Sequence, residues 1–285
     1  ARADPARDPA SGAGVAQGAA SPRAGSSRPR HVASLTRMGL FDRIKDFLAG
    51  DDAPPPLPPV TVMLTAAAPG TAETVAGLGV DVEPVLSVDG DAPIAWLVAK
   101  PGDGRALWSR LVAEFPTTGL WPLVAEGLDG DLDRPWREEE FEGPGTAIGD
   151  AEAVLRGNLS DNAGEEDEDK NEEPWRRELG PLAEATREPG PVELPVPHEA
   201  AALVLVPVTR PADAPAQLGW WGPTNYGLTG GDVSAVLRSW EDRFGAVLVA
   251  IGFDTLTLHV DTPPAGENAT RAAHEWFAFC PDSID

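Results

Sequence analysis

Five side chains near the end of the chain could take part in metal binding or acid-base catalysis: His259, His274, Glu275, Cys280 and Asp282. Imidazole, thiolate and carboxylate groups are the usual zinc ligands, and they also serve as general acids and bases. Zinc sites normally repeat short ligand spacings, and none is present. We therefore expect no metal and no cofactor, with a metal site of His259, His274 and Cys280 as the alternative.

The spacing of apolar residues predicts which of these side chains are buried and which are exposed. A helix from about Glu267 would bury Ala269, Ala272, Ala273, Trp276 and Cys280. A nucleophilic cysteine needs exposure and a lowered pKa, so this phase indicates a structural, core-facing Cys280. In the preceding strand, alternation places His259 on the more polar side.

A hydrolase-like enzyme is the alternative function, with Asn225, Glu241, His259 and His274 around one cleft of the C-terminal unit. The sequence contains no nucleophile-elbow, phosphate-loop or dinucleotide motif. Their absence makes a non-enzymatic protein the favoured interpretation. Glu241 and Arg243 are expected on a solvated helix face.

The best candidate binding site is an aromatic loop with glycine on both sides, containing Trp220, Trp221, Asn225 and Tyr226. Two adjacent tryptophans cannot both point inward on an extended segment. Exposed Trp and Tyr are typical of protein-binding hot spots. The alternative is that both rings cover a core edge beneath the loop.

The elements that position this loop belong to a C-terminal unit, residues 198–285. An apolar strand at 201–208 precedes the loop, and Thr229 with Asp232 predicts a capping box at the start of a helix. Gly245 ends that helix. Strands at 246–253 and 255–260 should then form an antiparallel pair before the last helix.

An N-terminal unit is predicted over residues 60–127. The expected strands are 60–64, 82–88, 94–99 and 120–124, and the expected helices are 71–78 and one capped by Asp103. Pro116 is expected to stop the second helix. The last strand contains Pro122, which favours a position at a sheet edge.

Between the units, residues 128–197 read as an acidic, largely irregular connector. Residues 129–193 carry 21 acidic and seven basic side chains, including a like-charge block at 165–169. That block lacks the spacing of a calcium loop. Trp136 and Trp175 are expected to hold the connector against a folded unit.

Before the units, residues 1–37 contain six Arg and two Asp and almost no large apolar side chain, which predicts disorder. Met38 looks like a start of translation, so we interpret 1–37 as an extension upstream of it. A basic arm is the alternative. Residues 38–59 are expected to form an amphipathic helix and a proline-rich linker.

The net charge of −24 restricts the partners. It repels phosphate backbones and anionic membranes, so neither nucleic acid nor a membrane is expected. A protein, of basic charge, is the favoured partner. The single cysteine allows no intrachain disulfide and suits the cytoplasm, while the oligomeric state is not determined by the sequence.

The C-terminal unit, over about 201–285, resembles the bacterial family catalogued as domain of unknown function 4253, common in actinobacteria. The resemblance rests on residues 221–225, 237–246, 254–256, 263–264 and 272–282. Members often have Cys-Pro after the loop asparagine, whereas Asn225 is followed by Tyr226. The family implies a fold and no activity.

Together these patterns predict an α+β or α/β protein of two small mixed-sheet units with flanking helices. The expected function is that of a cytoplasmic, non-enzymatic protein-binding or regulatory module, for which an immunity protein against a basic toxin is one concrete form. A structural subunit that tethers other proteins through its acidic connector is a further alternative.

Overall fold

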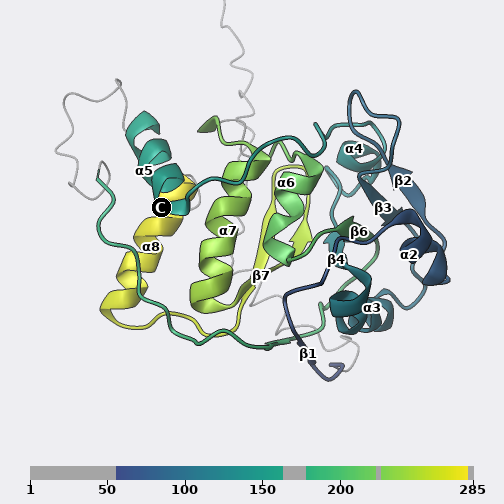
Figure 1. The fold of residues 1–285 in the computed structure, drawn as a ribbon, viewed down its shortest axis with the longest axis horizontal. Helices are drawn as coiled ribbons and strands as arrows, with labels where there is room; N and C mark the ends of the chain where they lie inside the picture. Colours follow the sequence, from purple (N-terminus) through teal and green to yellow (C-terminus); the bar gives the residue numbers. More distant parts are fainter. Residues whose placement is uncertain (1–55, 163–177, 223–225, 282–285) are drawn as a thin grey trace, which may run out of the picture.

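A computed structural model of the chain describes residues 56–162, 178–222 and 226–281. Its centre is a six-stranded sheet in the order β2-β3-β6-β4-β7-β8, which mixes antiparallel pairs with one parallel pair (Figure 1). The predicted α+β class is confirmed. The strands of this sheet are β2 (Glu83–Val85), β3 (Ala95–Val98), β4 (Leu120–Ala125), β6 (Leu203–Pro207), β7 (Ala246–Ile251) and β8 (Leu256–Val260).

The two predicted units share this one sheet. Strand β6, from the C-terminal unit, lies between β3 and β4 of the N-terminal unit and pairs antiparallel with both. All five residues of β6 are buried. A strand that is apolar on both faces gains most from a central position, where both faces are covered. Separate sheets for the two segments, as the sequence analysis supposed, are therefore not what forms.

Strand β4 is an interior strand, and the prediction of an edge position was wrong. Its parallel pairing with β7 covers only Val124 and Ala125, beyond Pro122. The proline therefore removes no hydrogen bond from that ladder. Two indoles supplement the local bonding: Trp121 Nε1 donates to the carbonyl of Leu248 at 2.8 Å, and Trp108 Nε1 to the carbonyl of Pro122 at 3.1 Å.

Helices and a short 3-10 turn surround the sheet. They are α2 (Ala72–Gly77), α3 (Gly104–Thr118), α4 (Asp133–Trp136), α5 (Ala151–Asn162), the 3-10 helix η2 (Pro211–Asp213), α6 (Ala214–Leu218), α7 (Gly230–Phe244) and α8 (Glu267–Phe279). The predicted Asp103 cap of α3 is confirmed. Pro116 does not stop α3, which continues to Thr118 and ends at Gly119, where φ is 63°.

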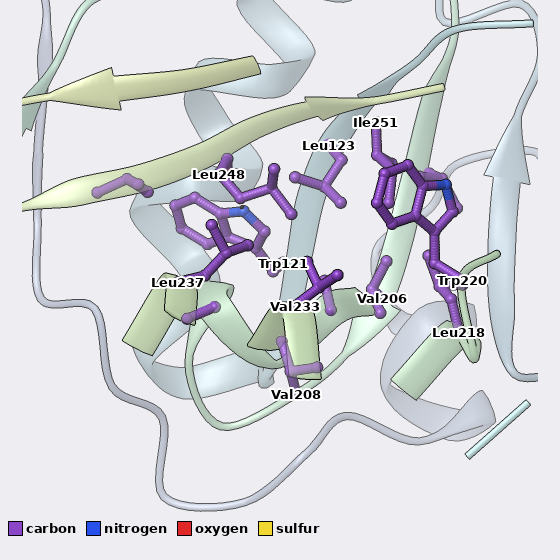
Figure 2. Close-up of a cluster of buried hydrophobic side chains, with 14 of the residues drawn as sticks. Trp121, Leu123, Val206, Val208, Leu218, Trp220, Val233, Leu237, Leu248 and Ile251 are labelled. Carbon is purple, nitrogen blue, oxygen red and sulfur yellow. Dashed lines mark hydrogen bonds between the residues drawn. The ribbon is translucent and has the colours of Figure 1, made fainter. Parts of the chain in front are cut away.

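Helix α7 forms as its sequence predicts. Thr229 and Asp232 make the capping box, and Gly245 ends the helix with a left-handed φ of 63°. Helices α6 and α7 lie next to each other over the sheet, with β7 behind them (Figure 1). Figure 2 shows the core between these layers, in which Leu237 of α7 meets Trp121 and Leu248 of the sheet.

The described part of the acidic connector is more ordered than an irregular linker. It contributes α4, α5 and β5 (Val192–Leu194), and β5 pairs with β1 (Val60–Val62) in a separate two-stranded sheet. Trp136 is buried, and its Nε1 donates to the carbonyl of Glu126 at 2.9 Å, as expected for a residue that holds the segment in place. Figure 1 shows α5 beside α7 and α8.

Some predictions fall outside the described residues. They concern the basic segment 1–37, the helix at 38–49, the acidic block at 165–169 and Trp175. In the part of the chain that the structure describes, none of the helices combines the length and apolar character needed to cross a bilayer.

Candidate binding site

The two adjacent tryptophans of the aromatic loop face different surroundings. Trp220 is 4% exposed, and its Nε1 donates to the carbonyl of Gly252 at 2.9 Å. Trp221 is 50% exposed. The prediction that both rings cannot point inward is therefore confirmed, and only Trp220 covers the core beneath the loop, beside Ile251 (Figure 2).

Backbone geometry fixes the place from which Trp221 projects. Helix α6 ends at Gly219, where φ is 63°, and the amide of Trp220 donates to the carbonyl of Pro215 at 3.0 Å. Gly222 packs against the Trp220 ring so closely that a Cβ at this position would lie 1.9 Å from it. Trp221 thus stands between two positions that packing restrains.

The other two predicted binding residues have different outcomes. Tyr226 is half-buried, and Asn225 lies outside the described residues. The candidate site is therefore centred on Trp221, with Trp220 as its support.

An acidic segment runs beside the aromatic loop. The amides of Glu142 and Gly143 donate to the carbonyls of Gly219 and Leu218, at 3.2 and 2.8 Å. Residues 126–142 carry eight acidic and two basic side chains. Both arginines, Arg134 and Arg137, already form ion pairs, so the segment retains excess negative charge. The acidic side chains exposed along it are Asp129, Asp131, Asp133, Glu138, Glu139 and Glu142.

Glu241 is not on a solvated face, and that prediction was wrong. The side chain is 3% exposed and accepts from Arg210 Nε at 2.8 Å and from the amide of Ala212 at 3.1 Å. Burial raises the pKa of Glu241 to about 7, although Arg210 and the Ala212 amide act in the opposite direction. The carboxylate of Glu241 joins α7 to the segment that contains η2. This segment packs on the face of α7 that was expected to be in contact with solvent.

Arg243 is half-buried rather than on a solvated face, because it pairs with Glu275 of α8. Its Nη1 and Nη2 donate to the two carboxylate oxygens of Glu275, at 2.9 and 2.5 Å. Glu275 is fully buried and also accepts from Trp240 Nε1 at 2.8 Å and from the amide of Ala183 at 2.6 Å. This pair ties α7, α8 and the end of the connector together.

The buried stripe of α8 differs from the predicted one. Glu275, Phe277, Ala278 and Phe279 are buried, whereas Ala273 and Trp276 are exposed. The Trp276 ring stacks on Trp240 at 5.3 Å and remains 36% exposed. Apolar periodicity cannot predict which face of α8 is buried, because the charged Glu275, paired with Arg243, occupies an inward position.

The two histidines lie on separate elements, and Cys280 is at the end of the helix that contains His274. His259 is in β8, where burial lowers its pKa against the raising effects of Asp261 and a hydrogen bond with the Glu193 backbone. His274 is in α8, and Cys280 follows α8 and is half-buried against the core. Within the described ranges, no three or more His, Cys, Asp or Glu residues are grouped as metal ligands would be.

Two members of the alternative catalytic set, Glu241 and His259, contact different partners in the described residues. Glu241 is held by Arg210 and Ala212, while His259 contacts the backbone of Glu193. No hydrogen bond or ion pair links Glu241 to His259 in the residues that the structure describes. Of the other two members, Asn225 lies outside those residues and His274 is in α8.

A shallow hollow of about 230 Å³ opens next to α6. Asp213, Gln217, Thr146 and Thr209 contribute its polar lining, and none of the predicted catalytic or metal-binding residues reaches it. Sequence reasoning missed this feature. An acid and an amide four residues apart, like Asp213 and Gln217, occur in many helices and do not by themselves indicate a site. The opposite wall of the hollow comes from segments that are distant in the chain, so the sequence gives no sign of it.

Comparison with known proteins agrees with the resemblance seen in the sequence. Residues 202–285 match the family model described as Domain of unknown function (DUF4253). The matched region supplies β6, β7, β8 and helices α6 to α8, while β2, β3 and β4 lie outside it. No curated protein and no solved structure matches the chain.

Proposed function

We propose that this protein is a non-enzymatic protein-binding module and that Trp221 is the centre of its binding surface. The observation that carries the proposal is the 50% exposure of Trp221 on a support fixed by the buried Trp220. Leaving a large aromatic ring in water forgoes the free energy of its burial, which a partner recovers on binding. Tryptophan is also among the residue types most enriched in binding hot spots.

The proposed partner is a basic protein. Charge complementarity supports this choice, because six exposed carboxylates line the segment beside the loop and the whole chain has a net charge of −24. Opposite charges speed the encounter and favour the correct partner. A basic toxin, held inactive by an immunity protein, has the required chemistry. A cytoplasmic location forms part of this proposal, since the single cysteine provides no intrachain disulfide.

The test uses the full chain as bait in an extract of its source cells, at low and at high ionic strength. Wild-type protein and the variants Trp221→Ala and Trp276→Ala are compared. Trp276 is the matched control, since it is the same residue type and is 36% exposed on α8. We expect a partner of high isoelectric point that the wild type and Trp276→Ala retain, and that Trp221→Ala or high salt releases. Equal recovery by all three baits, or an acidic partner, would contradict the proposal.

A further inference from the structure

The hollow beside α6 has the size of a single side chain. Its volume of about 230 Å³ is below the roughly 300–1,000 Å³ typical of cofactor and drug pockets. Three prolines and other apolar groups form most of its walls, and these give it a stiff shape. Such a site suits the end group of an extended molecule.

Two hydrogen-bond acceptors face this hollow from one surface of the η2-α6 segment. Asp213 and Gln217 are four residues apart, and side chains with that spacing project from the same side of a helix. The Oδ1 atom of Asp213 accepts from Arg238 Nε at 2.5 Å. Gln217 Nε2 donates to the carbonyl of Ile94 at 3.2 Å. Each side chain is therefore oriented by one hydrogen bond, and Asp213 Oδ2 and the single side-chain oxygen of Gln217, Oε1, are able to accept from a ligand.

The charge of the lining residues determines whether the hollow favours a cationic or an anionic ligand. Asp213 is the only charged residue that lines the hollow, within the described part of the chain. Behind it, Arg238 and Arg210 face three carboxylates, those of Asp213, Glu241 and Asp242. Because burial raises the pKa of Glu241 to about 7, the net charge of this cluster near neutral pH lies between zero and minus one. An anionic ligand would meet the carboxylate of Asp213 with no cation in the lining, whereas a cationic ligand is attracted by that carboxylate.

We propose that this hollow is a binding site for a guanidinium group, with Asp213 and Gln217 as its acceptors. A planar guanidinium presents several N–H donors in a fixed arrangement, which matches two oxygens on one surface better than a single ammonium does. This site is distinct from the Trp221 surface, so either can exist without the other. Its ligand is a small guanidinium compound or an arginine side chain of a protein.

The experiment titrates the full-length, isotope-labelled protein with N-acetylarginine amide and follows amide signals by NMR. The neutral isostere N-acetylcitrulline amide is the control ligand. We expect saturable shifts at the Gln217 side-chain amide and at Ala216 with the arginine compound, and at least tenfold weaker binding of the citrulline compound, about the effect of losing charge-assisted hydrogen bonds. Equal binding of the two compounds, or no saturable shift, would overturn the proposal.

Two glycines in one loop give a matched pair of variants. A Cβ at Gly145, in the lining, or at Gly149, outside it, would meet no atom within 4 Å. Gly145→Phe should fill the hollow and weaken binding by about tenfold or more, while Gly149→Phe should bind as the wild type does. Thermal melting confirms that both variants fold. Identical binding by the two would show that the ligand lies elsewhere.

Charge variants test the acceptor directly. Asp213→Asn keeps an oxygen for Arg238 but removes the charge, and it should weaken binding by about tenfold. Arg238→Gln removes the competing cation and should tighten binding. Tighter binding by Asp213→Asn, or weaker binding by Arg238→Gln, would overturn the assignment of Asp213 as the acceptor.

Two further arms separate this site from the Trp221 surface and identify the source of the ligand. Trp221→Ala should leave the titration unchanged, and loss of binding in this variant would place the cation at Trp221 and refute the site. A short alanine peptide with one central arginine is compared with the single residue. Tighter binding of the peptide indicates a protein source, and equal binding indicates a small compound.

Discussion

Arg243 and Glu275 form a bidentate ion pair across the junction of α7 and α8, with N···O distances of 2.9 and 2.5 Å. Glu275 also binds the amide of Ala183, so one buried carboxylate connects two helices and the connector. A buried pair of this kind contributes less through its own attraction than through the cost of leaving either charge alone.

The first prediction concerns this pair. Glu275→Ala should lower the free energy of unfolding by about 3–5 kcal/mol, because the half-buried Arg243 loses its counter-ion and the Trp240 indole and the Ala183 amide lose their acceptor. Glu267→Ala is the control, since Glu267 pairs with Arg271 on the surface of the same helix, and it should change stability by less than about 1 kcal/mol. Urea denaturation measures both. Similar losses for the two variants would mean that Glu275 has no special role.

The second prediction concerns pH. The pKa of Glu241 is about 7 in the folded protein, against its ordinary value of 4.5. The folded state therefore holds this proton more tightly than the unfolded state. Stability from this source is fully present below pH 4.5 and is lost as the pH rises through 7, by about 3 kcal/mol.

Glu241→Gln isolates this contribution, because the variant cannot titrate at position 241. The stability of the wild type relative to the variant should fall between pH 4.5 and 8. His259, whose pKa is lowered, acts in the opposite direction with pH but is present in both proteins and cancels in the difference. A difference that stays constant or rises with pH would show that Glu241 remains ionised in the folded state.

The third prediction separates the two tryptophans of the loop. Trp220→Ala should cost about 3–5 kcal/mol of unfolding free energy, because it empties a core position and leaves the Gly252 carbonyl without its donor. Trp221→Ala should cost less than about 1 kcal/mol, since the ring is half exposed. Chemical denaturation of the two variants compares them. A cost for Trp221→Ala as large as that for Trp220→Ala would make Trp221 a structural residue.

The fourth prediction concerns the end of α8. Asn158 Nδ2 donates to the carbonyls of Ala278 and Phe279, at 2.7 and 3.3 Å, from a buried position on α5. Asn158→Ala should cost about 1–3 kcal/mol, because buried carbonyls lose their donor. Ser160→Ala, at an exposed position of the same helix, should have little effect. Thermal unfolding that does not distinguish these variants would contradict the assigned role of Asn158.

Local signals in the sequence predicted local structure well. The Thr229–Asp232 capping box and Gly245 act within a few residues of each other, so α7 could be predicted with its bounds. Adjacency also indicated that Trp220 and Trp221 cannot both point inward, but not which of the two is buried. The family resemblance over the last part of the chain was recognisable from short motifs.

What the sequence did not predict depends on partners distant in the chain. The interior position of Pro122 depends on where the β7 ladder begins, and the central place of β6 depends on strands more than 70 residues earlier. Glu241 and Arg243 were expected on a solvated face, because their partners Arg210 and Glu275 could be assigned only in the folded chain. The hollow at Asp213 is likewise assembled from separate segments.

The measurement that tests the proposed function most directly is a calorimetric titration of the purified basic partner into wild-type protein, Trp221→Ala and Trp276→Ala. A hot spot contributes about 2 kcal/mol or more, so Trp221→Ala should raise Kd roughly thirtyfold or more while Trp276→Ala leaves Kd close to that of the wild type. If Trp221→Ala binds the partner as tightly as the wild type does, Trp221 is not the centre of the binding surface and the proposed function loses its basis.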